Sequence, residues 1–430
     1  MTRAVDRLPH RRLPLYYFAA AHAALILALL ALALDPRGAA GFFYHARMLA
    51  IVHLVTLGWI TTSILGSLYL VGPIALGIAM PVTRLDYTAF AIVVIGITGM
   101  VTHFWMASYS GMAWAAGTAT VGILIVVSRT AWRLRASPMP PGVLLHIRLA
   151  SLNIAIAATM GVLLGIDKVT HVLPGFVLTN VFAHAHMAAI GWATMMVVGV
   201  GYRLIPMVLP AQPPTGRSLF ISAILLETGV LGLLIGLLRQ SSLTRLFGAV
   251  VVCGLAAFAA HVGWMLRHRL RRPAAAPAID FTHVHAVMGG VWLLCSIGLG
   301  LFLLRQPMSD ALLRAALAYG VCGLLGFLAQ MVVAMQTRLL PPFRWYHLYA
   351  DSEYRTVPPS PWTMRDRPLQ WMACVAWAVG VPAIALGLSQ DGVGLLATGA
   401  WTLLAGVLLT TFDHLRVLGV LAGVDDEPRS

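Results

Sequence analysis

Charged residues are scarce in this chain of 430 residues, since Asp, Glu, Lys and Arg together make up only 10% of it. Soluble domains carry roughly 25% charged residues. Hydrophobic residues reach 59%, and the mean hydropathy is +0.84. A soluble fold of this length would not have enough polar surface to cover so much apolar material. The lack of charge therefore excludes a soluble protein and predicts an integral membrane protein.

Cysteine is also scarce, and its placement excludes two kinds of site. The four cysteines, Cys253, Cys295, Cys322 and Cys374, all lie inside apolar stretches, and no CxxC pair is present. Neither a disulfide framework nor a thiolate metal site is therefore expected. The formal net charge of +14 does not indicate nucleic-acid binding, because the arginines fall in short loops where they set membrane orientation.

Apolar runs recur along the whole chain, and each is close to the ~20 residues that cross a bilayer. Such runs must be helical, because backbone polar groups in the hydrocarbon need internal partners. We therefore predict an all-α, polytopic membrane protein of about twelve transmembrane helices, forming a single membrane domain over residues 1–430. The longest polar stretch, 341–367, is expected to be an interfacial loop. The predicted spans are 14–34, 47–72, 88–109, 112–133, 145–167, 180–206, 218–238, 246–266, 281–304, 310–337, 369–388 and 393–415.

Arginine clusters predict which side of the membrane each loop occupies. With twelve spans all the clusters fall on one side, which the positive-inside rule assigns to the cytoplasm. We expect multi-pass insertion into a bacterial-type inner membrane, with both termini cytoplasmic and membrane lipid around the protein. The clusters are Arg3, Arg7, Arg11 and Arg12; Arg129, Arg133 and Arg135; Arg267, Arg269, Arg271 and Arg272; and Arg338 and Arg344.

The second and sixth spans repeat one another. The runs that begin at His53 and at His186, 133 residues later, share identical residues at seven equivalent positions. Glycines allow close helix approach and prolines end helices, but packing explains the matched histidines less well. The pairs are His53 and His186, Gly58 and Gly191, Trp59 and Trp192, Thr61 and Thr194, Gly66 and Gly199, Tyr69 and Tyr202, and Pro73 and Pro206.

The tenth span continues the series more weakly, with Val321 at the histidine position. We predict three pseudo-symmetric four-helix units, at about 14–135, 145–270 and 281–415, around an axis along the membrane normal. The matching residues of the third unit are Gly326, Phe327, Ala334, Arg338 and Pro341, opposite Gly191, Trp192, Gly199, Arg203 and Pro206.

Six histidines gather at the predicted outer side, which is many for an apolar protein. A single one would usually form a helix–helix hydrogen bond, but two equivalent ones favour ligation of haem or metal. His184 and His186 lie roughly 200° apart around their helix, so they face different neighbours and cannot chelate one ion. The six are His45, His53, His103, His171, His184 and His186.

A second His-x-His motif, His283 and His285, opens the ninth span near the predicted cytoplasmic side. We expect His261 and His22 in the same half of the membrane. These histidines are candidates for a second cofactor site, and interfacial histidines beside a basic loop are an equally weighted alternative.

These residues resemble subunit I of the haem–copper oxidase superfamily, in its cbb3-type and nitric oxide reductase branches, along nearly the whole chain. That subunit has twelve helices in three pseudo-symmetric units, with metal histidines near the outer helix ends. The span from His53 resembles the helix that carries a low-spin haem ligand, and the span from His186 resembles the helix with the first copper ligand. The resemblance implies a haem b, with copper as a further candidate.

The chain departs from that family in two helices. Where the family has a His-His pair that completes the copper site, this chain has Arg239 and Gln240. Where the family's tenth helix has a His-x-His, it has Tyr319 and Val321, so a complete copper centre does not follow. The run HLVTLG from His53 also resembles the His-x-x-Thr-x-Gly signature of NnrS-type haem and copper proteins of nitric oxide metabolism.

The resemblance implies a membrane haem protein of respiratory electron transfer or of oxygen or nitric oxide chemistry. His53 would pair with His184 or His186 as axial haem ligands, and His186 alternatively binds a non-haem metal. No CxxCH is present, so covalent haem attachment is not expected. The candidate metal ligands are His45, His53, His184 and His186, and the candidate cofactor ligands are His53, His184, His186, His283 and His285.

Any redox role needs an electron donor, for which a cytochrome c subunit or a quinol is the candidate. An alternative from another class is a non-redox transporter built from the same repeats. Proton- or cation-coupled transport usually needs several intramembrane acids. Glu227 is the only glutamate inside a predicted span, so the sequence favours the haem protein.

Overall fold

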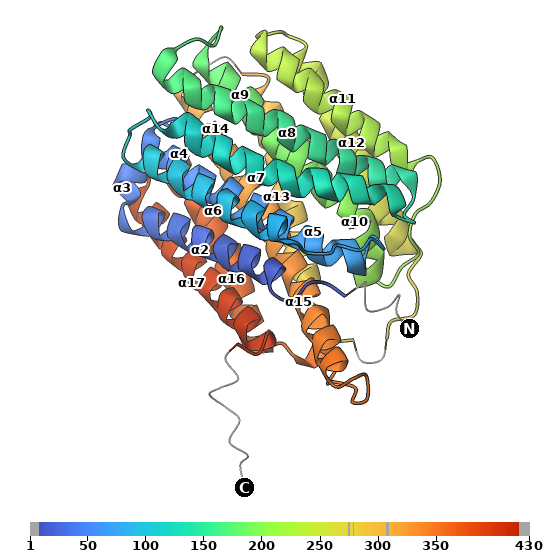
Figure 1. The fold of residues 1–430 in the computed structure, drawn as a ribbon. Helices are drawn as coiled ribbons and strands as arrows, with labels where there is room; N and C mark the ends of the chain where they lie inside the picture. Colours follow the sequence, from blue (N-terminus) through green and yellow to red (C-terminus); the bar gives the residue numbers. More distant parts are fainter. Residues whose placement is uncertain (1–7, 274–275, 278, 307–308, 421–430) are drawn as a thin grey trace.

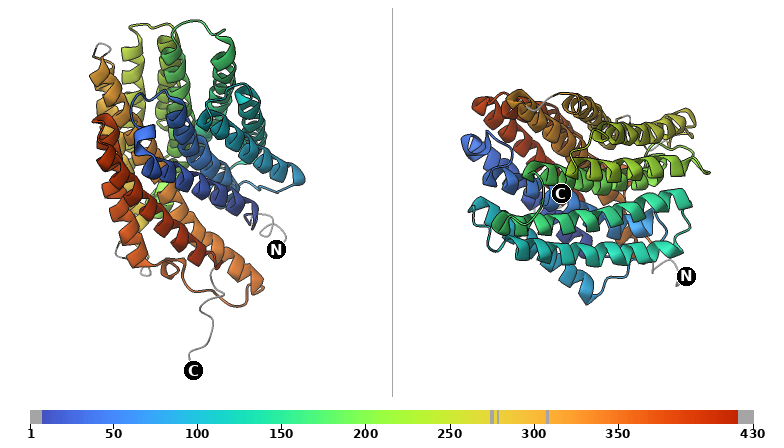
Figure 2. Two further views of the ribbon diagram at one scale, coloured as in Figure 1. Left: turned by 90° about the vertical axis from the view of Figure 1, so that its left-hand side faces the viewer. Right: turned by 90° about the horizontal axis from the view of Figure 1, so that it is seen from above.

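The structure is a computed structural model that describes residues 8–273, 276–277, 279–306 and 309–420. In these residues the chain is all-α and has twelve helices long and apolar enough to cross a membrane, which confirms the predicted fold class. Figures 1 and 2 show the helices in one bundle, and the first span packs against the last. Of the arginines used for orientation, Arg3 and Arg7 lie outside the described residues.

Nine of the twelve spans consist mainly of one α-helix. They are α2 (Leu13–Leu34), α6 (Arg84–Trp105), α7 (Met112–Arg133), α8 (Pro141–Thr170), α11 (Leu219–Leu238), α12 (Thr244–Arg267), α13 (Phe281–Leu303), α16 (Arg367–Ser389) and α17 (Val393–Val417). The short helices α3 (Pro36–Ala39) and η5 (Pro361–Thr363) lie between spans, and η2 (Leu134–Ala136) continues the fourth span after α7.

The second, sixth and tenth spans are composite, and these are the spans that carry the sequence repeat. Each has a π-helix between two α-helices, and π-helices are rare and frequent at functional sites. The segments are α4 (Ala46–His53), η1 (Leu54–Thr61) and α5 (Thr62–Ile74); α9 (Val177–His186), η3 (Met187–Thr194) and α10 (Met195–Val208); and α14 (Asp310–Val321), η4 (Cys322–Ala329) and α15 (Gln330–Asp351). Two of the π-helices therefore begin directly after His53 and His186.

The three π-helices meet inside the bundle through buried tryptophans. Trp59 of η1 donates its Nε1–H to the carbonyl oxygen of Ala329 in η4 (3.3 Å), and Trp192 of η3 donates to Thr61 Oγ1 in η1 (3.2 Å). Both indoles are almost fully buried. The equivalent position in η4 holds Phe327, whose side chain has no N–H to donate. These contacts agree with three equivalent units, and the pseudo-threefold symmetry itself stays a prediction.

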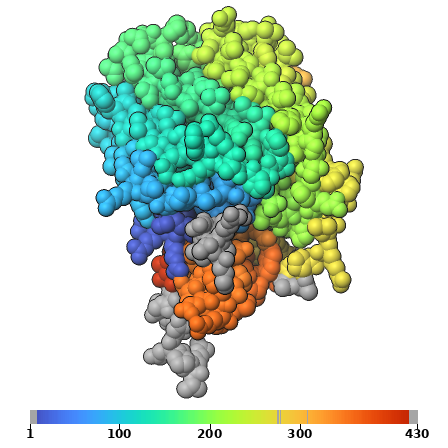
Figure 3. All heavy atoms as spheres, turned by 45° about the vertical axis from the view of Figure 1, so that its right-hand side comes forward, coloured from blue at the N-terminus to red at the C-terminus, as the bar shows by residue number. Residues whose placement is uncertain are grey.

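Proline ends two of the composite spans, as expected, but not the third. Pro73 and Pro206 lie in the last turns of α5 and α10, whereas Pro341 and Pro342 lie inside α15, which continues to Asp351. The predicted loop at 341–367 is therefore wrong over its first part, which Figure 3 shows as the orange end of the molecule. A helix tolerates proline where neighbouring groups bind the freed carbonyls.

Small residues bring neighbouring spans into close contact, as is usual in membrane helix packing. At Gly96 of α6, a Cβ atom would lie 2.3 Å from the backbone nitrogen of Ala119 in α7. At Gly380 of α16, it would lie 3.0 Å from the backbone nitrogen of Leu403 in α17. Neither position has room for a side chain unless the helices separate.

Candidate functional site

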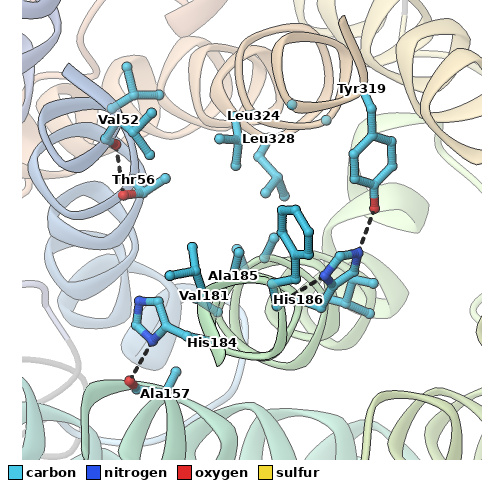
Figure 4. Close-up of a pocket in the computed structure, with 18 of the residues that line it drawn as sticks. Val52, Thr56, Ala157, Val181, His184, Ala185, His186, Tyr319, Leu324 and Leu328 are labelled. Atoms are coloured by element: carbon cyan, nitrogen blue, oxygen red, sulfur yellow. Dashed lines mark hydrogen bonds between the residues drawn. The ribbon is translucent and has the colours of Figure 1, made fainter. Parts of the chain in front are cut away.

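A large cavity lies among the composite spans, and the close-up of Figure 4 shows part of it. Its volume is about 630 Å³, and its lining is mostly Leu, Ile, Val, Ala and Phe. Three of the predicted ligands, His53, His184 and His186, are among the lining residues. We call this space the histidine cavity. The structure thus brings together three side chains that come from two spans and are far apart in the sequence.

His53 is the last residue of α4, directly before η1. Its Nδ1–H donates to the carbonyl oxygen of Leu49 (2.7 Å), one turn earlier in the helix. The ring stacks on Phe104 of α6, with centroids 4.9 Å apart. A carbonyl oxygen only accepts, so the proton is on Nδ1 and Nε2 presents its lone pair. Nε2 of His53 has no hydrogen-bond partner among the described residues.

His184 of α9 is held in the same way by a different helix. Its Nδ1–H donates to the carbonyl oxygen of Ala157 in α8 (3.0 Å), as Figure 4 shows. The ring lies against Gly161, where a Cβ atom would come within 3.2 Å of His184 Cε1. Nε2 again carries the lone pair and has no partner within the described part of the chain. His184 and His53 line the same cavity.

His186 lies on the other side of α9, as the spacing of two residues predicts. Its Nδ1–H donates to the carbonyl oxygen of Phe182 (2.7 Å), and its Nε2 accepts a hydrogen bond from the Tyr319 hydroxyl (3.1 Å). Figure 4 shows Tyr319 reaching down from α14 to this ring. Both nitrogens of His186 are therefore engaged, unlike those of His53 and His184. The sequence identified Tyr319 only as a departure from the oxidase pattern, not as a partner of His186.

Lys168 is a lining residue of the histidine cavity that the sequence reasoning missed, although it is the only lysine of the chain. Its Nζ lies 3.8 Å from the ring centroid of Tyr44 and 5.3 Å from that of Tyr109, so the ammonium sits between two aromatic faces. Burial raises the pKa of Tyr44 to about 12, so the phenol stays neutral beside this cation.

The remaining predicted ligands lie outside the histidine cavity. His45 is the N-cap residue of α4: its Nδ1 accepts from the Met48 backbone N–H (3.3 Å), and its Nε2 approaches the Ala39 carbonyl oxygen at 3.2 Å. His283 lies 3.7 Å from Asp280 at the start of α13. His261 hydrogen-bonds Tyr202 (2.9 Å).

His285 belongs to a second group of buried side chains in the arginine-rich half of the protein. Its Nδ1 accepts from Gln330 Nε2 (3.2 Å), and its Nε2 lies 3.3 Å from Cys374 Sγ. His22 lies in the same half of the protein, in a second hydrogen-bonded set with Gln336, Thr411 and His414. We call the two sets together the polar cluster, and it consists of His22, His285, Gln330, Gln336, Cys374, Thr411 and His414.

Within the described residues, no three His, Cys, Asp or Glu side chains are arranged to hold a metal ion. The two free imidazole nitrogens suit instead a cofactor that takes one or two histidines. No protein-family model matches the chain, and no curated protein matches it. The chain is an integral multi-pass membrane protein, and its finer function is argued below from the histidine cavity.

Proposed function

We propose that the histidine cavity binds a haem b, with His53 and His184 as the axial ligands of its iron. One observation carries this proposal: two imidazoles from different spans line one apolar cavity, and each has an Nε2 without a hydrogen-bond partner among the described residues. Histidines that ligate metals usually donate their other ring N–H to a carbonyl or carboxylate, which fixes the tautomer. Leu49 and Ala157 supply such carbonyl groups here.

The cavity also fits the cofactor in size and polarity. Cofactor sites are typically cavities of ~300–1,000 Å³ lined by apolar side chains with a few placed polar groups. The histidine cavity has about 630 Å³ and is predominantly apolar. Lys168, at the end of the cavity where α8 finishes, supplies a positive charge that suits the carboxylates of a porphyrin.

A bound haem would supply one-electron redox chemistry, with gas binding only where an axial position stays open. The protein's own residues orient the two imidazoles, fix their tautomers and line the cavity with apolar side chains. The carbonyl groups of Leu49 and Ala157 hold the Nδ1 protons of both imidazoles, so each Nε2 would be available to the iron. Phe104 stacks on the ring of His53, and the apolar lining would keep water from the cofactor. His186 is engaged by Tyr319 and remains outside the ligand pair.

With both axial positions filled, the function supported best is electron transfer within the membrane, as in proteins that resemble oxidase subunit I or the NnrS type. The donor would be a cytochrome c subunit or a quinol. A second candidate is chemistry on oxygen or nitric oxide. The observation that favours it is the Tyr319–His186 pair, which places a hydroxyl and a further imidazole beside the same cavity.

The test is a reduced-minus-oxidised absorption spectrum of the purified protein, with iron and copper analysis. We expect the spectrum of a b-type haem and iron in stoichiometric amount. Carbon monoxide should leave the reduced spectrum unchanged if both axial positions are filled, and should shift it if one is open. A protein without haem signal, iron or copper would overturn the proposal and favour the transporter.

A further inference from the structure

A second, smaller cavity lies at the arginine-rich end of the protein, where α13 and α16 begin and α15 passes Pro341. Its volume is about 220 Å³, and it shares no lining residue with the histidine cavity. Its charged lining residues are Arg338, Arg365, Arg367 and Asp280. We call it the arginine pocket. Three guanidinium groups around one small space make it a candidate for an anion.

The most buried of these groups, Arg365, has a donor left over. Its side chain is only 9% exposed, and its two terminal nitrogens donate to Asp413 (2.7 Å) and to the Gln336 carbonyl oxygen (3.3 Å). Its Nε has no partner among the described residues, although it is buried. A buried donor without an acceptor costs free energy, and this donor belongs to a residue that lines the arginine pocket.

The other two arginines leave positive charge in the pocket. Arg338 lies over the ring of Trp362 (4.5 Å) and is only 3.9 Å from Asp280 at its nearest approach, which is loose for an ion pair. Arg367 forms no ion pair with any described residue. Asp280 and Asp413 offset two of the three charges. α13 and α16 both begin at the arginine pocket, so the positive ends of their helix dipoles add to the positive potential there.

We propose that the arginine pocket binds a phosphate group, carried either by an anionic lipid headgroup or by free phosphate. Guanidinium groups match phosphate oxygens with paired, charge-assisted hydrogen bonds. The pocket lies at the end of the transmembrane helices, and Phe281, Pro341 and Trp362 supply apolar walls beside the arginines. This site is independent of the haem proposal, because the two cavities share no lining residue.

The test uses the full chain in a neutral detergent and measures the shift of its thermal unfolding temperature with added ligand. One series adds inorganic phosphate, a second adds a short-chain phosphatidylglycerol, and a third adds phosphatidylcholine of the same chain length. We expect saturable stabilisation by phosphate, by phosphatidylglycerol or by both, and none by phosphatidylcholine beyond the detergent blank. Stabilisation by phosphatidylglycerol alone identifies the lipid as the source, and stabilisation by phosphate alone identifies the free anion.

Two variants locate the site without disturbing the Arg365–Asp413 pair. Arg367→Gln and Arg338→Gln should each weaken the binding about tenfold, as expected for one charge-assisted contact. Arg305→Gln, an exposed arginine elsewhere, is the matched control and should bind as the unchanged chain does. Absence of saturable binding, or equal binding by all three variants, would overturn the proposal. Haem content plays no part in this readout.

Discussion

The histidine cavity and the polar cluster both hold buried histidines in the same membrane-spanning bundle, but their hydrogen bonding differs. In the cavity, His53 and His184 each use one nitrogen on a backbone carbonyl and keep the other free. In the cluster, His22 contacts Thr411 (2.7 Å) and Gln336 (2.9 Å), so both of its nitrogens are used.

A free nitrogen at the histidine cavity distinguishes His53 and His184 from His22 and His285, whose nitrogens contact side chains of neighbouring helices. His414 of the cluster also has a buried Nε2 without a partner among the described residues, but it does not line the cavity. A buried polar group is costly unless it is hydrogen-bonded, so His22 and His285 are satisfied by side chains of neighbouring helices. His53 and His184 each have one nitrogen without a hydrogen-bond partner among the described residues, and both residues line the histidine cavity. The same residue type therefore serves two purposes, which its hydrogen-bond partners reveal.

The largest expected effect is loss of haem when a free imidazole is removed. His53→Ala and His184→Ala should each lower the haem content of the purified protein at least tenfold, because each removes one iron ligand. Haem content is measured by pyridine haemochrome absorbance per protein. His45→Asn is the matched control, since His45 caps α4 outside the cavity and Asn is a good cap. Unchanged haem in both alanine variants would refute the site.

Replacement of a histidine of the polar cluster should lower the stability of the protein and leave its haem content unchanged. His22→Ala removes one hydrogen-bond partner each from Gln336 and Thr411, which keep their bonds to Ser63 and Val407. It should lower the free energy of unfolding by about 1–3 kcal/mol. The haem content should stay that of the unchanged chain. Thermal unfolding and absorbance measured on the same sample check both expectations. Loss of haem from a folded His22→Ala protein would abolish the distinction between the two regions.

The indoles of Trp59 and Trp192, in the π-helices, contact the polar cluster and the histidine cavity respectively. Trp59 packs edge-on against His22 of the cluster (4.9 Å), while Trp192 lines the cavity and bonds Thr61. Trp192→Phe removes that hydrogen bond and should cost about 1 kcal/mol of stability. Chemical unfolding measures the change, with Trp114→Phe, at an exposed indole, as the control. Equal stability of both variants would show that the contact does not contribute.

A smaller effect is expected from crowding His184. Gly161→Ala places a methyl group 3.2 Å from His184 Cε1, so the ring must move by a few tenths of an ångström. We expect haem affinity to fall about threefold, or ~0.6 kcal/mol. Gly263→Ala, where the added carbon meets nothing within 4 Å, should bind haem normally. The measurement is haem titration of the apoprotein, and an identical affinity for both variants would argue against His184 as ligand.

The smallest effect separates His184 from its neighbour His186. Tyr319→Phe removes the hydroxyl that hydrogen-bonds His186 Nε2, and we expect the haem spectrum to stay unchanged. If His186 were the second ligand, the Tyr319 hydroxyl would compete with the iron for its Nε2, so removal of the hydroxyl would change the iron–imidazole bond and shift the bands. The spectrum of this variant thus decides which face of α9 meets the haem.

The sequence predicts the spans well because the bilayer dictates their length and composition. All twelve predicted runs overlap observed helices, and the offset between His53 and His186 is repeated by the π-helices that follow them. Hydropathy fails at Pro341, because whether a helix continues through proline depends on the neighbours that satisfy its backbone, and these lie elsewhere in the chain.

The sequence predicted the histidines of the cavity but not their hydrogen bonds. Spacing placed His184 and His186 on different faces of one helix, and the repeat selected His53. Which nitrogen is free depends on Ala157 and Tyr319, which lie 27 and 133 residues away from their histidines. The role of Lys168 had no sequence signal except that it is the only lysine.

The central claim is that His53 and His184 together ligate one haem, and electron paramagnetic resonance of the oxidised protein tests it most directly. The unchanged chain should give a low-spin ferric signal, as expected with two histidine ligands. A partly loaded His184→Ala protein should give a high-spin signal that returns to low spin when imidazole is added. A low-spin signal in His184→Ala without imidazole, or no haem signal in the unchanged chain, would contradict the claim.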